Sequence, residues 1–189
     1  VDISAVTKST GNVVDASEFT STSTSLILKG SATGATTLKG GAGPDTLIGG
    51  EGADNFSGGA GADTISGGAG TDTITGGAGA DVIDGGDDND IFIYVATADL
   101  VAANALVDRL TGGGGTADAI AINNNGGATF TLASTDLIEA RMSVVEKIVA
   151  AGVSNQIISI TVSDLLFEDG VTTIDLSADT NATGSNVID

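Results

Sequence analysis

The 189-residue sequence contains no cysteine, histidine or tryptophan, and only one proline, one tyrosine and one methionine. The absence of cysteine excludes disulfides and thiolate metal sites, and the absence of histidine removes the commonest zinc ligand and general base. No run of about 18 apolar residues is present to form a membrane-spanning helix. The chain starts at Val1 without a signal-peptide pattern, and we expect a fragment or a processed product. Because aromatic residues make up only 3% of the chain, the core must consist of thin aliphatic layers, as in a solenoid.

Acidic residues outnumber basic ones, 25 against 6, and the formal net charge is -19. Such a polyanion repels nucleic acid, which excludes a nucleic-acid partner, and it attracts cations. Acidic chains of this kind are usually disordered. Here, however, 41% of the residues are hydrophobic, and Ile, Val and Leu recur at regular spacing. A chain that is disordered without a bound cation and ordered with one fits both observations.

Six consecutive nonapeptides occupy residues 40–93. They read GGAGPDTLI, GGEGADNFS, GGAGADTIS, GGAGTDTIT, GGAGADVID and GGDDNDIFI, and the common pattern is Gly-Gly-x-Gly-x-Asp-x-apolar-x. A flexible glycine-rich linker has no reason to place an aspartate at every sixth position and an apolar residue at every eighth. The pattern therefore indicates a folded repeat.

The chemistry of the repeat points to calcium, a hard cation that takes roughly 6–8 oxygen ligands from carboxylates and backbone carbonyls. Glycine permits a sharp turn and lets carbonyls approach an ion closely. The sixth position supplies the carboxylates, which are Asp45, Asp54, Asp63, Asp72, Asp81 and Asp90. The last three residues of each repeat form a short strand whose middle side chain points inward. These inward residues are Leu47, Phe56, Ile65, Ile74, Ile83 and Phe92.

The repeat resembles the calcium-binding nonapeptide of RTX (repeats-in-toxin) proteins, which forms the β-rolls of serralysin-type proteases and haemolysins. The resemblance implies an all-β, right-handed parallel β-roll in which two nonapeptides make one coil. Each calcium ion then lies between a turn and the turn one coil later. One edge pairs Asp45 with Asp63 and Asp63 with Asp81. The other edge pairs Asp54 with Asp72 and Asp72 with Asp90, which gives about four interior ions and further incomplete sites at the ends.

The same resemblance implies that backbone carbonyls at positions one to four of the turns complete the metal sites. The glycines of these turns are Gly40, Gly41, Gly43, Gly49, Gly50, Gly52, Gly58, Gly59, Gly61, Gly67, Gly68, Gly70, Gly76, Gly77 and Gly79. Carboxylates stacked about 5 Å apart repel one another strongly without an ion. We therefore expect the calcium-free chain to be unfolded.

Two segments depart from the pattern. Residues 31–39 keep the glycine and leucine register but place Thr36 where the aspartate belongs, which predicts a first coil without a carboxylate. The sixth repeat has Asp87 and Asp88 at positions three and four, and the loss of glycine at position four puts its turn geometry in question. Asp87 and its acidic neighbours either complete a terminal calcium site or form a solvated acidic loop, and both interpretations stay open.

The flanking sequence predicts further β-structure, either as rungs on the roll or as a sandwich-like segment. Strands are expected within residues 1–6, 12–15, 25–29, 144–149, 157–162 and 171–176. We expect one short helix near residues 97–106. The chain is accordingly divided into an N-terminal cap (1–39), the roll (40–93) and a C-terminal β-rich segment (94–189).

Two aspartates follow the repeats, and each lies two residues before an aliphatic residue: Asp108 before Leu110, and Asp118 before Ile120. The arrangement resembles the segment that closes the β-rolls of the serralysin family. Asp108 and Asp118 either bind calcium or cap a turn, and capping is favoured for a lone aspartate.

The two ends of the sequence resemble each other. Residues 1–15 read VDISAVTKSTGNVVD, and residues 174–189 read IDLSADTNATGSNVID, with Ser185 as a single added residue. The chain therefore resembles a little more than one period of a tandem array, and chance similarity of Ser-, Thr- and Asp-rich sequence is the alternative. Copies in such an array stack or join into a fibre or a surface layer.

We expect a calcium-binding structural module of a secreted bacterial cell-surface protein, since the chain resembles S-layer proteins and giant repetitive adhesins exported by type I secretion. Such proteins fold outside the cell, where calcium is plentiful. The alternative is the C-terminal secretion and folding domain of a type I-secreted RTX enzyme or toxin, which would occur once and not in an array. No nucleophile–base pair can be recognised, so we expect no enzyme. The expected partners are calcium and neighbouring copies.

Overall fold

The computed structural model describes residues 2–3, 12–95, 101–102, 105–106, 108–123, 129–132, 142–143, 145, 147–150, 157–160, 173–175 and 187–188. All regular elements in these ranges are β-strands, labelled from β1 to β20. Within the same ranges, no helix has the length and hydropathy needed to cross a membrane.

Seven strands form the first sheet, in the order β1-β3-β5-β7-β9-β13-β16. Their bounds are β1 Asp2–Ile3, β3 Ile27–Lys29, β5 Thr46–Gly50, β7 Thr64–Ala69, β9 Val82–Asp87, β13 Arg109–Gly113 and β16 Met142–Ser143. Each strand pairs with its neighbours in parallel.

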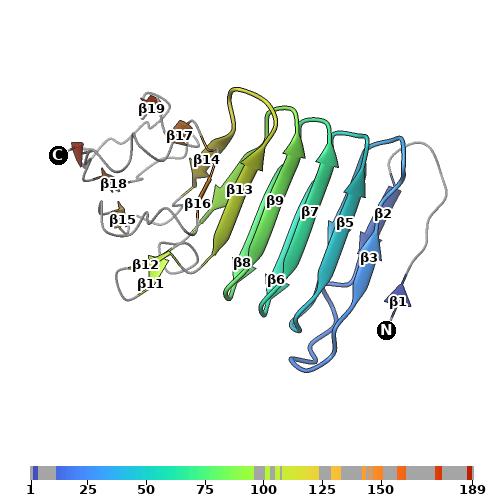
Figure 1. Cartoon of the computed structure of the whole chain (residues 1–189). Coiled ribbons are helices and arrows are strands. Elements are labelled where there is room, and N and C mark those ends of the chain that lie inside the picture. Colours follow the sequence, from blue (N-terminus) through green and yellow to red (C-terminus); the bar gives the residue numbers. More distant parts are fainter. Residues whose placement is uncertain are drawn as a thin grey trace.

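Eight strands form the second sheet, in the order β19-β17-β14-β10-β8-β6-β4-β2, and again every pairing is parallel. Their bounds are β2 Asn12–Asp15, β4 Thr36–Lys39, β6 Asn55–Ala60, β8 Thr73–Ala78, β10 Ile91–Tyr94, β14 Ala119–Ile122, β17 Lys147–Ala150 and β19 Thr173–Asp175. Because successive strands from β1 to β10 alternate between the two sheets, the chain winds as a coil, and the coils stack along the molecule (Figure 1). The predicted parallel β-roll is confirmed.

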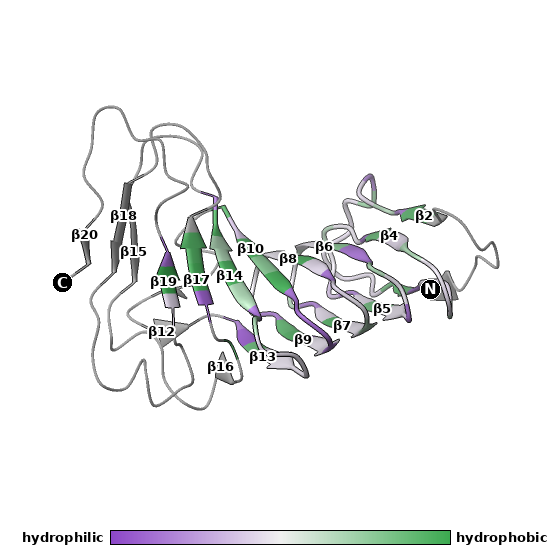
Figure 2. Cartoon of the chain, turned by 90° about the horizontal axis from the view of Figure 1, so that it is seen from above, coloured by the Kyte–Doolittle hydropathy of each residue, from purple (hydrophilic) through white to green (hydrophobic). Residues whose placement is uncertain are grey.

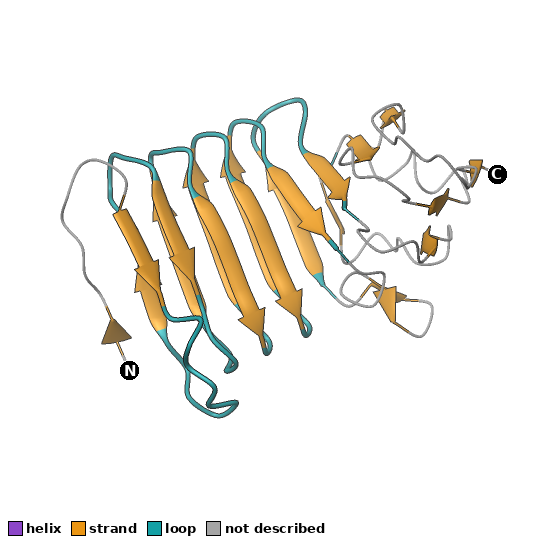
Figure 3. Cartoon of the chain, turned by 180° about the vertical axis from the view of Figure 1, so that it is seen from behind, coloured by secondary structure: helices purple, strands orange, loops and turns teal. Residues whose placement is uncertain are grey.

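The repeats set the length of the coil. Thr64 pairs with Thr46 on one side and with Val82 on the other, so each coil takes two nonapeptides. The strands are longer than predicted, because they continue into the glycines of the next repeat: Gly59 pairs with Gly77 one coil later. Figure 3 shows short turns, drawn in teal, between the strands of the repeats, and longer teal loops near the N-terminal strands.

The core is a double row of aliphatic and phenylalanine side chains between the sheets. The six predicted inward residues of the repeats are confirmed, since none exposes more than 2% of its surface. The row continues on both sides of the repeats, with Leu28 and Leu38 before them and Leu110, Ile120 and Ile148 after them. Figure 2 shows apolar residues, in green, recurring from strand to strand along the stack. Each fully buried side chain of this size stabilises the fold by about 1.5–3 kcal/mol.

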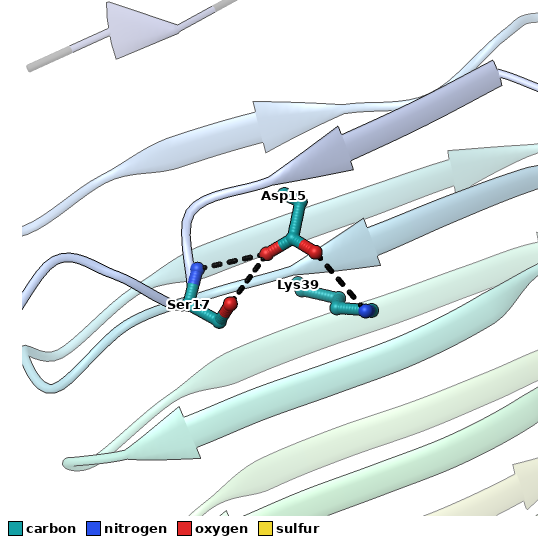
Figure 4. A network of polar contacts seen from close by, with 3 residues as sticks. All are labelled: Asp15, Ser17 and Lys39. Carbon is teal, nitrogen blue, oxygen red and sulfur yellow. Dashed lines mark hydrogen bonds and ion pairs between the residues drawn. The ribbon is translucent and has the colours of Figure 1, made fainter.

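A surface contact joins the first strands of the second sheet (Figure 4). Lys39 Nζ lies 3.0 Å from Asp15 Oδ2, and the Ser17 hydroxyl and N–H donate to Asp15 Oδ1 at 2.6 and 3.0 Å. The Ser17 hydroxyl, its N–H and the Lys39 ammonium together lower the pKa of Asp15 to about 2. This contact fixes the start of the loop that leads from β2 to β3.

The coil becomes longer after the repeats. A third sheet appears, in the order β15-β18-β20, with β15 Thr129–Leu132, β18 Ile157–Ile160 and β20 Val187–Ile188. Ala119 pairs with Lys147, and Thr129 pairs with Ile157, so one coil here takes slightly more chain than three nonapeptides. The second sheet is continuous across the expected segment boundaries after residues 39 and 93, since β4 pairs with β6 and β10 pairs with β14. Each of the expected strand segments contains a strand of the structure.

The predicted helix near residues 97–106 is wrong in the part that the structure describes. β11 (Val101–Ala102) and β12 (Ala105–Leu106) form an antiparallel pair, and the other residues of the segment lie outside the described ranges. Alanine and leucine are good helix formers, which is why the segment predicts a helix, but an isolated helix shorter than about 12–15 residues is marginal in water and tertiary context overrides propensity. A two-residue connection between the strands suits a hairpin instead.

Candidate metal centre

Buried aspartates form two columns, one along each edge of the roll, which we call ladders. The first ladder precedes the strands of the first sheet and contains Asp45, Asp63, Asp81 and Asp108. The second precedes the strands of the second sheet and contains Asp54, Asp72, Asp90 and Asp118. All eight side chains are at most 2% exposed.

Each ladder is held by hydrogen bonds between successive coils. Oδ1 of Asp63 accepts the N–H of Asp45 at 2.7 Å, and Oδ1 of Asp81 accepts the N–H of Asp63 at 2.9 Å. In the second ladder the equivalent bonds run from Asp54 to Asp72 and from Asp72 to Asp90, at 2.7 and 2.9 Å. All four pairs predicted from the sequence are therefore neighbours in space.

The other carboxylate oxygen defines the chemistry of the ladders. Oδ2 of Asp63, Asp72 and Asp90 is buried and accepts no hydrogen bond from any residue that the structure describes. Burial raises the pKa of Asp63 and of Asp72 to about 7, although the N–H from the preceding coil opposes the shift. The carboxylates one coil before and one coil after add to the rise. Burial likewise raises the pKa of Asp90 to about 6. A buried anionic oxygen without a partner is costly, and a bound cation removes that cost.

In the first aspartate of each ladder, both carboxylate oxygens accept hydrogen bonds from backbone N–H groups. Asp45 accepts the N–H of Leu26 at Oδ1 and that of Gly41 at Oδ2, at 2.9 and 2.7 Å. Asp54 accepts the N–H groups of Thr36 and Gly50 in the same way. The predicted first coil without a carboxylate is confirmed, because Thr36 occupies the place of the aspartate.

Glycine keeps the turns free of side chains around these oxygens. A Cβ at Gly58, the first position of its repeat, would overlap Oδ2 of Asp63 and the carbonyl oxygen of Gly76. At the second position, Gly59 has a φ of 110° and a Cβ there would overlap the carbonyl oxygen of Gly41. The other predicted glycines occupy the equivalent places in their turns. The turns thus gather carboxylate and carbonyl oxygens, a donor set of oxygen alone that fits calcium.

The sixth repeat keeps the geometry of the turn despite its lost glycine. Asp88 stands where Gly61, Gly70 and Gly79 stand in other repeats, and its φ of 71° lies in the same left-handed region. Aspartate adopts this region more readily than most residues. Asp87 and Asp88 are exposed and belong to neither ladder, and calcium binding by Asp87 stays a prediction.

For Asp108 and Asp118, calcium binding and turn capping both stay predictions, but the structure gives both residues a place in the ladders. Oδ1 of Asp108 accepts the N–H of Asp81 at 2.8 Å, and Oδ1 of Asp118 accepts that of Asp90 at 2.7 Å, so both continue the ladders. The sequence signal for this place is the aliphatic residue two positions after each aspartate, because the same spacing separates positions six and eight of a repeat. Within the described ranges no three acidic side chains converge on one point.

The chain forms a parallel roll with buried carboxylate ladders, and comparison with known families finds a match to this part of it. The family model of the RTX calcium-binding nonapeptide repeat, which spans four copies, matches residues 32–65 and 57–92. Residues 32–92 are thus RTX repeats, and the chain carries a calcium-binding β-roll. No curated protein and no solved structure matches the chain.

Proposed function

We propose that the chain is a structural module of a secreted bacterial cell-surface protein, S-layer-like or adhesin-like, which folds when calcium enters the ladders. The observation that carries the proposal is the set of buried Oδ2 atoms of Asp63, Asp72 and Asp90 that accept no hydrogen bond. Calcium supplies the positive charge that these oxygens lack. The proposal includes no catalytic role.

The four aspartate pairs of the repeats each accommodate one ion in this proposal. Asp63 and Asp72 serve two pairs each, so their carboxylates lie between two ions. Turn carbonyls complete the coordination, because two carboxylates alone cannot provide the roughly 6–8 oxygens that calcium takes.

Coupling between binding and folding suits export. An ion that binds only the folded chain stabilises it by mass action, so folding follows the calcium concentration. In a compartment poor in calcium the chain stays unfolded and can pass a type I exporter. It folds outside, where calcium is plentiful.

The similarity between residues 1–15 and 174–189 favours an array over a single secretion domain. Both segments provide strands of the parallel sheets, β1 and β2 in one case and β19 and β20 in the other. A neighbouring copy that presents the same strands extends the stack of coils. The secretion domain of an RTX enzyme or toxin is the second candidate, and the β-roll supports it equally.

Circular dichroism during a calcium titration tests the proposal. We expect an unfolded spectrum in chelator and a β-sheet spectrum with calcium, whereas magnesium at the same concentration should have much less effect because it demands octahedral geometry. Equal folding in chelator would contradict the coupling. Sedimentation of the calcium-loaded chain tests assembly, and discrete monomers at high concentration would contradict the array.

A further inference from the structure

The two ladders end differently. In the second ladder, Asp118 follows four glycines, residues 112–115. Its turn has one residue more between the first glycine and the aspartate than the turn of a repeat has. Gly113 and Gly115 have φ values of 106° and 105°, like the glycines of the repeats. A Cβ at Gly113 would overlap the carbonyl oxygen of Gly86, which is the same close approach that Gly59 makes to Gly41. The turn that presents Asp118 is therefore built like the calcium-binding turns.

The turn that presents Asp108 in the first ladder has lost these features. The four positions that hold Gly-Gly-x-Gly in a repeat hold Ala103, Asn104, Ala105 and Leu106 here. Ala105 and Leu106 belong to the antiparallel strand β12, so they form no glycine turn. Asp108 follows Asp90 after two nonapeptide lengths instead of one, because a longer segment replaces the short turn.

A tyrosine hydroxyl meets the second oxygen of Asp108. Tyr94 donates its O–H to Asp108 Oδ2 at 2.7 Å, while Oδ1 accepts the N–H of Asp81. Both side chains are buried, at 2% and 0% exposure. Tyr94 follows Phe92 on the inward face of β10, so its ring is part of the core and its hydroxyl reaches the ladder from inside the roll. Asp108 thus has a protein donor where Oδ2 of Asp63 has none.

We propose that the Tyr94 hydroxyl takes the place of a calcium ion at the end of the first ladder. The first ladder then binds two ions and stops at Asp63–Asp81. The second ladder gains a third site between Asp90 and Asp118, where Asp90 Oδ2 is buried without a hydrogen bond. The folded chain therefore binds five ions and not the four that the repeats alone predict. This inference rests on the proposed calcium function.

Counting bound calcium per chain, by equilibrium dialysis with elemental analysis, tests the proposal on the full chain. We expect five ions for wild type, four for Asp118→Asn and five for Asp108→Asn. Asparagine preserves the Oδ1 acceptor, so each variant removes the charge and keeps the inter-coil bond. An Asp108→Asn chain that loses an ion, or an Asp118→Asn chain that loses none, overturns the inference. A wild-type chain that binds no calcium refutes the proposed function itself, which is a distinct result.

Tyrosine spectroscopy gives a second test that does not depend on the folding of the Asp118 variant. Tyr94 is the only tyrosine and the chain has no tryptophan, so its emission reports on one hydroxyl. In the calcium-loaded wild type we expect emission quenched by the carboxylate, and recovery in Asp108→Asn. Equal emission from the two calcium-loaded chains overturns the inference, because the hydroxyl would then not be bound to Asp108.

Discussion

Replacing Asp72 by asparagine separates the two properties of the ladder carboxylate, its hydrogen bonding and its charge. Asp72 Oδ1 accepts the N–H of Asp54, its own N–H is donated to Asp90, and its carbonyl accepts the N–H of Ile91. Asparagine retains all three bonds. What it removes is a buried negative charge that only an ion can balance. The substitution should therefore stabilise the calcium-free fold and weaken the calcium-loaded one.

The size of the first effect follows from the pKa of Asp72. A carboxyl with a pKa of about 7 in the folded chain and 3.8 ordinarily opposes folding at pH 8 by about 4 kcal/mol, since each pKa unit corresponds to about 1.4 kcal/mol. A buried amide N–H₂ without a partner costs about 1–3 kcal/mol. The calcium-free Asp72→Asn chain should be more stable than wild type by about 1–3 kcal/mol.

Folding in chelator can be measured by adding trimethylamine N-oxide, which favours compact states, and following circular dichroism. The variant should fold at a lower concentration of the osmolyte than wild type. In dialysis it should bind two ions fewer, because Asp72 serves both the Asp54–Asp72 and the Asp72–Asp90 sites. The matched control is Glu18→Gln, which removes an exposed charge and should change neither result. A variant that folds less readily in chelator, or that binds as much calcium as wild type, would refute the reasoning.

Three further perturbations test other parts of the structure. Gly59→Ala should destabilise the calcium-loaded chain by at least about 1–3 kcal/mol, because its φ is 110° and a Cβ meets a carbonyl, whereas Gly114→Ala, with its nearest contact at 3.2 Å, should cost much less in a thermal melt. Phe56→Ala should cost about 3–5 kcal/mol in denaturant unfolding, and the exposed Phe19→Ala should cost little; similar losses would contradict the two-row core. In chelator, acid should promote folding: the pKa of Asp63 is raised, so its unfavourable charge is absent below about pH 4 and develops as the pH rises through about 7. Identical spectra in chelator at pH 4 and pH 8 would count against this prediction.

The repeats could be predicted because their signal is local and periodic. Glycine, aspartate and an apolar residue recur at fixed positions, and each of these residue types has a separate physical reason to be there. Beyond the repeats this local signal is lost, so the continuation of the ladders could not be predicted from the sequence. A long segment separates Asp108 from Asp90, and Asp118 follows an extra residue, so the glycine turns no longer recur in register although the stacking continues.

The longer coil that follows the repeats has no such local signal in the sequence. Strands such as β15 and β18 are short and pair across a long stretch of chain, without glycine turns at a fixed spacing. Their strand character is visible in the sequence, but their partners follow from stacking on the previous coil, which is a tertiary effect. The bond between Tyr94 and Asp108 is of the same kind, since it joins an inward strand position to a later turn.

The ends of the ladders explain where calcium is needed. A single nonapeptide contributes one inward apolar side chain, so a coil forms only against its neighbours. Each added coil of the middle also buries carboxylates such as Asp63 and Asp72, whose Oδ2 atoms accept no hydrogen bond from the described residues. At the N-terminal end, backbone N–H groups donate to both oxygens of Asp45 and Asp54, so in the pairs Asp45–Asp63 and Asp54–Asp72 the oxygen that needs an ion belongs to the later aspartate. On the proposal above, Tyr94 does the same for Asp108, and the demand for calcium falls on the middle coils and on the end of the second ladder.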